Sequence, residues 1–267
     1  MRPLGVPKAR RTEVRARWLL AGALLLGPGA APAADNAFLP VAGAELRTVL
    51  PAGREQSVRV AGFLLQRHPV TNAEFLAFVS AHPEWRRGTA PRILVGSDYL
   101  GHWSGALAPG TGAADAQPVT RVSWFAAQAY CEAQGGRLPG WYEWELAAAA
   151  GPDRRDARSD PLWRQQLLDW YARPAGEALP AVGEAQPNFY GLYDLHGLVW
   201  EWVLDFNSLL PADADPEQFC GSGAQNLQLK DNYAVLMRIA MLGSLRAADT
   251  GRTLGFRCAR DGQARSP

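Results

Sequence analysis

Helical periodicity in this sequence is confined to the region between Thr71 and Tyr171, and this limits the fold more than any other feature. Capping residues, spaced apolar residues and an initiating Pro predict four helices there, at 71–82, 124–134, 141–150 and 161–171. On either side, short apolar stretches are separated by Gly, Pro, Asn and Asp, a pattern typical of strands and turns. Central helices followed by irregular strands predict an α+β domain.

Strands are expected at both ends of this region. Short apolar runs from Val41 to Phe63, broken by Pro51-Ala52-Gly53, predict two strands joined by a turn. Beyond Pro174 we expect strands alone, in the apolar stretches 190–192, 198–204, 237–245 and 254–258. Residues 86–118 show little periodicity and are expected to form a long irregular loop, which is usually functional or simply surface. Ten Trp residues indicate a core of bulky aromatics and argue against a helical bundle.

The first 33 residues have the pattern of a secretory signal peptide. A basic leader precedes an apolar run at 18–27 and small residues around Ala31-Pro32-Ala33. That run of about ten residues is too short to cross a bilayer as a helix. We therefore expect residues 34–267 to form a single domain without a membrane span, in the periplasm or secreted. An uncleaved anchor, and a twin-arginine signal at Arg10-Arg11, stay open as alternatives.

Charge excludes two classes of partner. Without the leader the chain holds 21 Lys and Arg against 25 Asp and Glu, a net charge near −4. No basic cluster stands out in the sequence, so neither nucleic acid nor an anionic membrane is an expected partner.

Three cysteines are present, Cys131, Cys220 and Cys258. Export to an oxidising compartment favours one disulfide, although spacing alone does not choose the pair. Cys220 lies in a Gly-rich turn with no His or Lys nearby in the sequence to activate it, which favours a structural thiol.

Three stretches, in order along the chain, carry a family resemblance: Pro69-Val70-Thr71-Asn72-Ala73-Glu74-Phe75; Pro118 to Trp124 with Ala129-Tyr130-Cys131 and Gly136-Arg137-Leu138-Pro139; and Asn188 to Asp194 through Trp200-Glu201-Trp202 to Leu254-Gly255-Phe256-Arg257-Cys258. They cover most of the chain and resemble the formylglycine-generating enzyme (sulfatase-modifying factor) family. The resemblance implies a C-type-lectin-like α+β fold with much irregular structure. It also implies a disulfide between Cys131 and Cys258, which leaves Cys220 free.

The family's catalytic centre is not reproduced. Active members bind copper through two cysteines just upstream of an Ala-Ala pair, whereas Met241 and Arg246 precede Ala247-Ala248 in this chain. Arg offers no lone pair to a metal and a single thioether is a weak ligand. We therefore expect no copper, no catalytic residue and no oxidase activity.

A calcium loop of the family is better preserved. The resemblance implies calcium ligands at Asp194, the carbonyls of Gly197 and Val199, and Glu201, and hard oxygen ligands suit that ion. The alternative is that Asp194 caps a turn and Glu201 forms a buried salt bridge. His196 lies within the loop and is expected to be a packing residue.

Within the family, this chain is similar to the NirV-type proteins, which are encoded alongside copper nitrite reductases in denitrifying bacteria. The similarity lies in residues 195–206, in the turn 220–224 and in the stretch 237–245. That similarity implies a periplasmic accessory protein of denitrification, with copper nitrite reductase as its partner. Two alternatives stay open, a copper-dependent oxidase acting on a peptide cysteine of sulfatases, and a peptide- or protein-binding scaffold. Trp103, Trp141 and Trp144 are candidates to line a binding groove.

Overall fold

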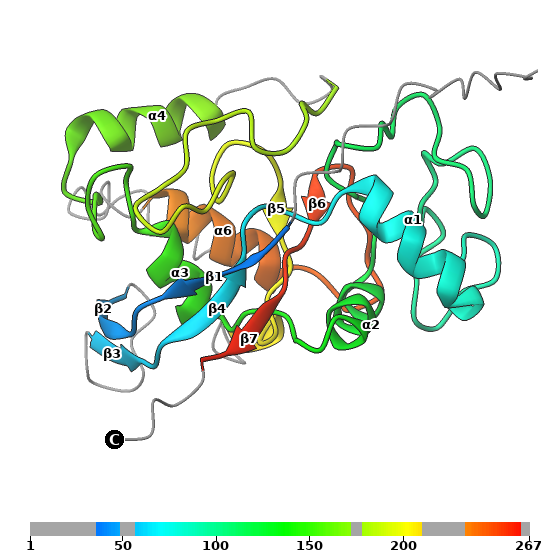
Figure 1. The fold of residues 1–267 in the computed structure, drawn as a ribbon, viewed down its shortest axis with the longest axis horizontal. Helices are drawn as coiled ribbons and strands as arrows, with labels where there is room; N and C mark the ends of the chain where they lie inside the picture. The colour runs from blue at the N-terminus through cyan, green and yellow to red at the C-terminus, as the bar shows by residue number, and fades with distance from the viewer. Residues whose placement is uncertain (1–35, 49–56, 172–177, 210–232, 263–267) are drawn as a thin grey trace, which may run out of the picture. The chain divides into compact units, whose positions relative to one another are not determined.

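The computed structural model describes residues 36–48, 57–171, 178–209 and 233–262 (Figure 1). The chain divides into two units, Met1–Pro32 and Ala33–Pro267, of which the first lies outside the described residues. Cys220 and the turn at Pro51 also lie outside them. Among the described helices, none is long and apolar enough to cross a membrane.

A three-stranded antiparallel sheet brings the two ends of the described chain together (Figure 1). Its order is β1 (Phe38–Val41), β4 (Phe63–Gln66) and β7 (Ala259–Asp261), so the last strand pairs with one near the start. Phe63 and Leu65 alternate toward the core on β4, as a strand with one buried face requires. Between β1 and β4 in the sequence, β2 (Ala44–Arg47) and β3 (Ser57–Val60) pair in antiparallel fashion. They are the predicted pair of strands.

The central helices begin where the sequence predicted. Thr71 precedes α1 (Asn72–Ala81), and its hydroxyl accepts from the Glu74 amide while the Glu74 carboxylate accepts from the Thr71 amide. Ser123 caps α2 (Trp124–Ala133) in the same way, through the Ala126 amide. Side-chain capping satisfies amides that a helix leaves unpaired, which explains why these boundaries could be predicted.

The remaining two predicted helices are also present, as α3 (Trp141–Ala148) and α4 (Pro161–Tyr171). The first amide of α3, that of Trp141, donates to the Asp205 carboxylate over 2.7 Å. Short 3₁₀ turns are present at η1 (Pro83–Trp85), directly after α1, and at η2 (Phe206–Ser208). Residues 86–118 contain no helix or strand, so the predicted irregular loop is confirmed.

The prediction that only strands follow Pro174 is wrong, because Tyr233–Gly243 forms helix α6. This segment is apolar at nearly every position, and a continuous apolar run does not distinguish a strand from a buried helix. Ile239 and Leu242 are both buried, three positions apart, which is helical spacing. The strand predicted at Tyr190 is also absent, because the Asn188 side chain accepts from the Tyr190 and Leu192 amides and forms a turn. Within the predicted stretches 198–204 and 254–258, strands β5 (Trp200–Glu201) and β6 (Leu254–Gly255) form and pair in parallel.

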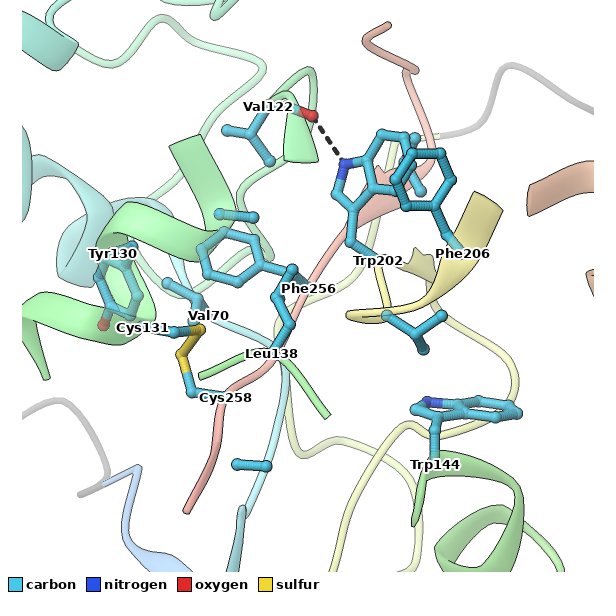
Figure 2. Packing of buried hydrophobic residues seen from close by; sticks show 14 of the residues in the cluster. Val70, Val122, Tyr130, Cys131, Leu138, Trp144, Trp202, Phe206, Phe256 and Cys258 are labelled. Atoms are coloured by element: carbon cyan, nitrogen blue, oxygen red, sulfur yellow. Dashed lines mark hydrogen bonds between the residues drawn. A yellow bond between two sulfur atoms is a disulfide. The ribbon is translucent and has the colours of Figure 1, made fainter. Parts of the chain in front are cut away.

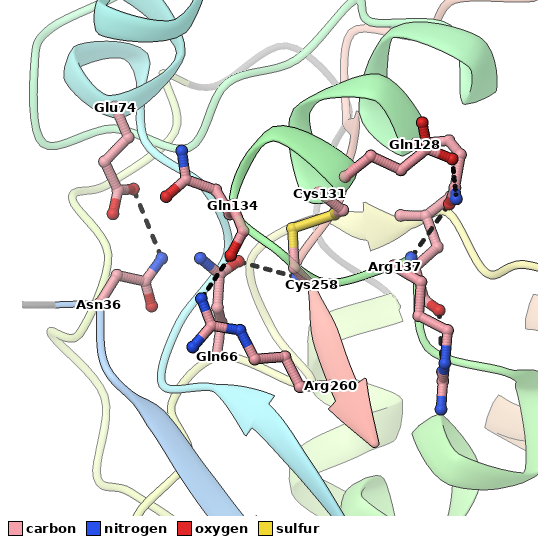
Figure 3. The surroundings of a disulfide bond; sticks show 11 residues. Asn36, Gln66, Glu74, Gln128, Cys131, Gln134, Arg137, Cys258 and Arg260 are labelled. Atoms are coloured by element: carbon pink, nitrogen blue, oxygen red, sulfur yellow. Dashed lines mark hydrogen bonds between the residues drawn. A yellow bond between two sulfur atoms is a disulfide. The ribbon is translucent and has the colours of Figure 1, made fainter.

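The core is aromatic and contains the disulfide (Figure 2). The rings of Tyr130 and Phe256 lie 5.3 Å apart between centroids, and Phe75 lies 5.9 Å from Tyr130. Cys131 on α2 is bonded to Cys258 just before β7, and the Cys258 amide donates to the Gln66 side chain (Figure 3). The disulfide that the family resemblance implied is therefore present, and it joins the helical region to the sheet.

Candidate functional site

One pocket is formed by the long irregular loop and the turn that follows α6. It has a volume of about 860 Å³. We call it the arginine pocket, and its lining includes Arg87, Arg92, Val95, Gly96, Tyr99, Gly101, Arg246, Ala248 and Asp249. The two segments are far apart in sequence, and contacts between their backbones hold them together. A Cβ at Gly96 would lie 3.0 Å from the Ala248 carbonyl oxygen. The two segments therefore approach so closely that a residue larger than Gly would push one of them away.

The backbone beside the arginine pocket is strained. Leu100 and Arg121 have φ angles of 47° and 55°, and only one other described non-Gly residue, Asp194, has a positive φ. The Leu100 amide donates to the Arg121 carbonyl, and the Arg121 amide donates to the Gly251 carbonyl. Strain of this kind persists only where surrounding contacts fix it, and it is concentrated at functional sites.

Two ion pairs and two unpaired arginines surround this pocket. Arg246 contacts Asp249 at 2.9 Å, and Arg121 contacts Asp98 at 2.7 Å. Burial alone would raise the pKa of Asp249, but hydrogen bonds from the Arg246 side chain and amide outweigh burial and lower the pKa. Arg87 and Arg92 form no ion pair or hydrogen bond within the described part of the chain.

His102 follows the pocket residue Gly101 in the sequence, and burial together with the charged groups around the pocket shifts its pKa. Burial, helped by the positive charges of Arg121 and Arg87 and opposed by the negative charge of Asp98, lowers the pKa of His102 to about 4. Its Nδ1 atom is buried and has no hydrogen-bond partner among the described residues. The imidazole is therefore neutral at pH 7, and the fixed charges near the pocket are arginines and aspartates.

Met241 and Arg246, which the family resemblance aligns with the copper-binding cysteines, have other contacts in the structure. Arg246 lines the pocket with its guanidinium paired to Asp249, and Met241 packs against the hydrophobic core from α6. The two cysteines within the described residues, Cys131 and Cys258, are joined to each other. No thiol of the described chain therefore lies in the pocket.

At the predicted calcium loop, Glu201 forms the buried salt bridge of the alternative interpretation. Glu201 is completely buried against Arg257, whose Nε donates to both carboxylate oxygens and whose Nη2 donates to Oε1 over 2.8 Å. The Trp144 indole donates to Oε2 over 2.9 Å. Each oxygen thus accepts two hydrogen bonds, so in this geometry Glu201 is not free to coordinate a cation.

The Asp194 side chain hydrogen-bonds to a segment upstream in the chain. Its Oδ2 accepts from the Gly183 amide over 2.6 Å, and burial raises the pKa of this carboxyl although the Gly183 hydrogen bond opposes the rise. No group of three or more His, Cys, Asp or Glu that could hold a metal is found in the part of the chain that the structure describes. The structure places Gly197 and Val199 in the same segment, with Gly197 at a φ of 96°.

His196 is a packing residue, as the sequence predicted. Its Nε2 hydrogen-bonds to the Ala148 carbonyl over 2.8 Å, and its ring forms T-shaped contacts with the rings of Trp144 and Trp163. Because a carbonyl can only accept, Nε2 carries the proton, and the buried Nδ1 is left with an unpaired lone pair. Burial lowers the pKa of His196 to about 4.

The three tryptophans named as candidates to line a binding groove are buried instead. Trp103, Trp141 and Trp144 are exposed by only 2%, 1% and 1%. Their indole N–H groups donate to Asn72, Glu145 and Glu201, respectively. A Trp whose N–H finds an internal acceptor can be buried whole, and these three belong to the core.

Sequence reasoning missed Arg87 and Arg92. The signal was present, since Arg86, Arg87 and Arg92 give the loop a local excess of positive charge in an otherwise acidic domain. Only the fold shows that two of them face the turn at Arg246 across one pocket.

Comparison with known proteins agrees with this architecture. The chain belongs to the sulfatase-modifying factor enzyme 1-like family, whose model matches residues 8–262. It is 32% identical to the formylglycine-generating enzyme of Streptomyces coelicolor over 260 residues, covering 77% of this chain and 80% of that enzyme. It spans 63% of the length of the formylglycine-generating enzyme of Thermomonospora curvata, to which it is 30% identical over 191 residues, or 58% of this chain.

A further relative differs from these two by its description as inactive. The inactive C-alpha-formylglycine-generating enzyme 2 of Mus musculus is 29% identical, over 91% of this chain and 90% of its own length. Among solved structures, that of CarF matches with a TM-score of 0.52 and 19% identity, covering 85% of this chain and 98% of CarF. This last likeness supports the fold alone.

Proposed function

We propose that this protein is an exported, non-catalytic relative of the formylglycine-generating enzymes that acts by binding a partner protein. The observation that carries the proposal is Arg246. The family resemblance aligns it with a copper-binding cysteine of active members, and in this chain it is an exposed guanidinium paired with Asp249. A fixed positive charge repels a metal cation and cannot donate an electron pair to it.

The expected partner is a copper nitrite reductase in the periplasm. This part of the proposal is supported by the similarity of residues 195–206 to NirV-type proteins and by the signal-peptide pattern of residues 1–33. The existence of an inactive relative of similar length is consistent with a family member that works without turnover. In this role the domain docks to the reductase or assists its maturation.

A binding experiment with defined components tests this proposal. Residues 34–267 are mixed with purified copper nitrite reductase from the same organism, and complex formation is measured by calorimetry and by co-elution in gel filtration. We expect a stoichiometric complex with micromolar or tighter affinity. If the two proteins elute separately at concentrations of tens of micromolar, whether the reductase is apo or copper-loaded, the assignment of the partner is wrong.

The oxidase alternative has its own test. The protein is incubated with copper, oxygen and a cysteine peptide taken from a sulfatase, and aldehyde formation is followed by mass spectrometry. We expect no aldehyde, and the Streptomyces coelicolor enzyme serves as the positive control. Aldehyde formed at more than background would overturn the non-catalytic assignment and would require ligands outside the described residues.

Calcium binding at the Asp194 loop stays a prediction. Both carboxylate oxygens of Glu201 already accept hydrogen bonds from Arg257 and Trp144, so calcium would have to replace at least one of these hydrogen bonds. Calcium is titrated into chelator-treated protein, and the heat of binding and the Tm are measured. A ligand that binds only the folded state raises the Tm, so a saturable heat with a rise in Tm would establish the site. No heat and no rise at millimolar calcium would remove it.

A further inference from the structure

We propose that the arginine pocket binds carboxylate side chains of an acidic peptide segment, and that Arg87 and Arg92 are the residues that hold them. This inference rests on the proposed binding function and names the chemistry of the ligand. It concerns a pocket that lies wholly within described residues.

The charge arrangement carries the argument. The arginine pocket is lined by three arginines and one aspartate, and that aspartate is committed to Arg246. The neighbouring Arg121 is likewise committed to Asp98 over two short contacts. Arg87 and Arg92 are left without a partner within the described residues, although the domain as a whole carries more acidic than basic residues. Two unpaired guanidinium groups on one pocket give it a positive potential that attracts anions.

The type of cation points to the type of anion. A guanidinium is planar and offers parallel N–H donors that match a carboxylate or a phosphate. Arginine pairs with a carboxylate twice next to this pocket: Nη1 of Arg121 donates to both oxygens of Asp98, and Asp249 accepts from the side chain and the amide of Arg246. A carboxylate presented by a ligand would complete the same arrangement at Arg87 and Arg92.

The size and walls of the pocket favour a peptide over a free ion. A volume of about 860 Å³ is far larger than one carboxylate or phosphate requires. Val95, Tyr99 and Ala248 add apolar or aromatic wall to the same pocket. A pocket with both apolar and cationic wall suits a peptide segment that combines small apolar residues with acidic ones.

The pocket is also rigid enough to select its ligand. Gly96 touches the Ala248 carbonyl, and the strained Leu100 and Arg121 are fixed by backbone hydrogen bonds. A surface that is already ordered loses less conformational entropy on binding, so its charges contribute more to affinity.

The test uses a probe of defined chemistry. Isothermal titration of residues 34–267 with an acetylated, amidated hexapeptide of alternating Glu and Ala is compared with the same peptide carrying Gln in place of Glu. We expect the Glu peptide to bind at least about tenfold more tightly at low salt, and the difference to shrink in about 0.5 M NaCl because exposed charges are screened. Equal affinity of the two peptides would overturn the proposal.

Variants test whether the Glu peptide binds at the arginine pocket, and they are expected to lower its affinity in one case and raise it in another. Arg87→Gln with Arg92→Gln is expected to weaken Glu-peptide binding about tenfold or more. Asp249→Asn is expected to strengthen it, because this change frees Arg246 while the Asn oxygen can still accept from the Arg246 amide. Arg59→Gln with Arg154→Gln is the control, since it removes the same charge from exposed arginines outside the pocket lining. If this control weakens binding as much as the pocket variant, the attraction is non-specific and the proposal fails.

Two further outcomes separate the ligand sources and the two proposals. Inorganic phosphate that binds as tightly as the Glu peptide would mean a free-ion site and would refute the peptide assignment. Copper nitrite reductase that still binds the Arg87→Gln, Arg92→Gln variant with unchanged affinity would refute the pocket inference while leaving the proposed function intact. Glu-peptide binding by a protein that does not bind the reductase would support the pocket inference and refute the choice of partner.

Discussion

The carboxylate of Glu201 and the guanidinium of Arg257 are both completely buried, whereas the arginines of the arginine pocket are reached by solvent. Arg257 also donates to the carbonyls of Gln66, Arg67 and Tyr193, so one side chain ties β4, the Asp194 loop and β5 together. Around the pocket the opposite holds, since Arg87 and Arg92 contact no acceptor within the described residues.

This difference separates structural charge from functional charge. A buried ion must find all its partners inside the protein, because leaving one unpaired costs several kcal/mol. An exposed ion is hydrated, so it can stay unpaired until a ligand binds with little loss in the free energy of unfolding. Removing a charge should therefore destabilise the protein at the first site and affect only binding at the second.

The largest expected effect comes from breaking the buried pair. Glu201→Gln leaves Arg257 buried without a counter-charge, and we expect a loss of about 3 to 5 kcal/mol in the free energy of unfolding, measured by urea denaturation. Glu45→Gln is the matched control, because Glu45 pairs with Arg59 at the surface, where side-chain exposures are 53% and 84%. The control should lose less than about 1 kcal/mol. Similar losses for the two variants would show that burial does not set the value of the pair.

The disulfide is expected to rank second. It links residues 127 positions apart, and in the chain-entropy model such a crosslink contributes up to about 4 to 5 kcal/mol, with measured values usually lower. Replacing Cys131 and Cys258 together with Ala should therefore lower the free energy of unfolding by about 2 to 4 kcal/mol. The single Cys131→Ala variant should lose a similar amount, since either change opens the loop. A double variant as stable as the native protein in urea would contradict this account.

A buried neutral histidine gives the next effect, and it depends on pH. Burial lowers the pKa of His196 from 6.5 to about 4. Between those values the unfolded chain binds a proton that the folded chain does not, so stability falls as pH drops from about 6.5 to about 4. From pH 7 to pH 5 this one group should remove about 2 kcal/mol.

Comparison with His196→Gln measures this contribution. Gln can still donate toward the Ala148 carbonyl but does not titrate, so its free energy of unfolding should fall less between pH 7 and pH 5 than that of the native protein. His102 also has a lowered pKa, but it is present in both proteins and cancels in the difference. Parallel pH profiles for the two proteins would mean that His196 is protonated in the folded state or solvated.

Features decided by neighbouring residues could be predicted from the sequence. The capping of α1 at Thr71 and of α2 at Ser123 depends on amides within three positions, and both helices start where those residues predict. The family resemblance supplied the Cys131–Cys258 pairing, which spacing alone had left open.

Features decided by residues far apart in the sequence could not be predicted from it. Trp144 is buried because Glu201 accepts its indole N–H from another part of the chain, and no local pattern reveals that acceptor. Helix α6 lies in an apolar run that fits a strand equally well until its neighbours are known. The arginine pocket depends on a contact between the loop at Gly96 and the turn at Ala248, so its arginines gain their meaning only from the fold.

The smallest expected effect on stability is also the sharpest test of the comparison. Arg87→Gln with Arg92→Gln removes two charges that contact no acceptor within the described residues, so the free energy of unfolding should change by less than about 0.5 kcal/mol. Because the two arginines repel each other and Arg246 nearby, the change can be slightly stabilising at low salt. Urea denaturation with and without added salt measures it. A loss above about 1 kcal/mol would mean that these arginines already have partners in the folded protein and that the pocket's charge is structural.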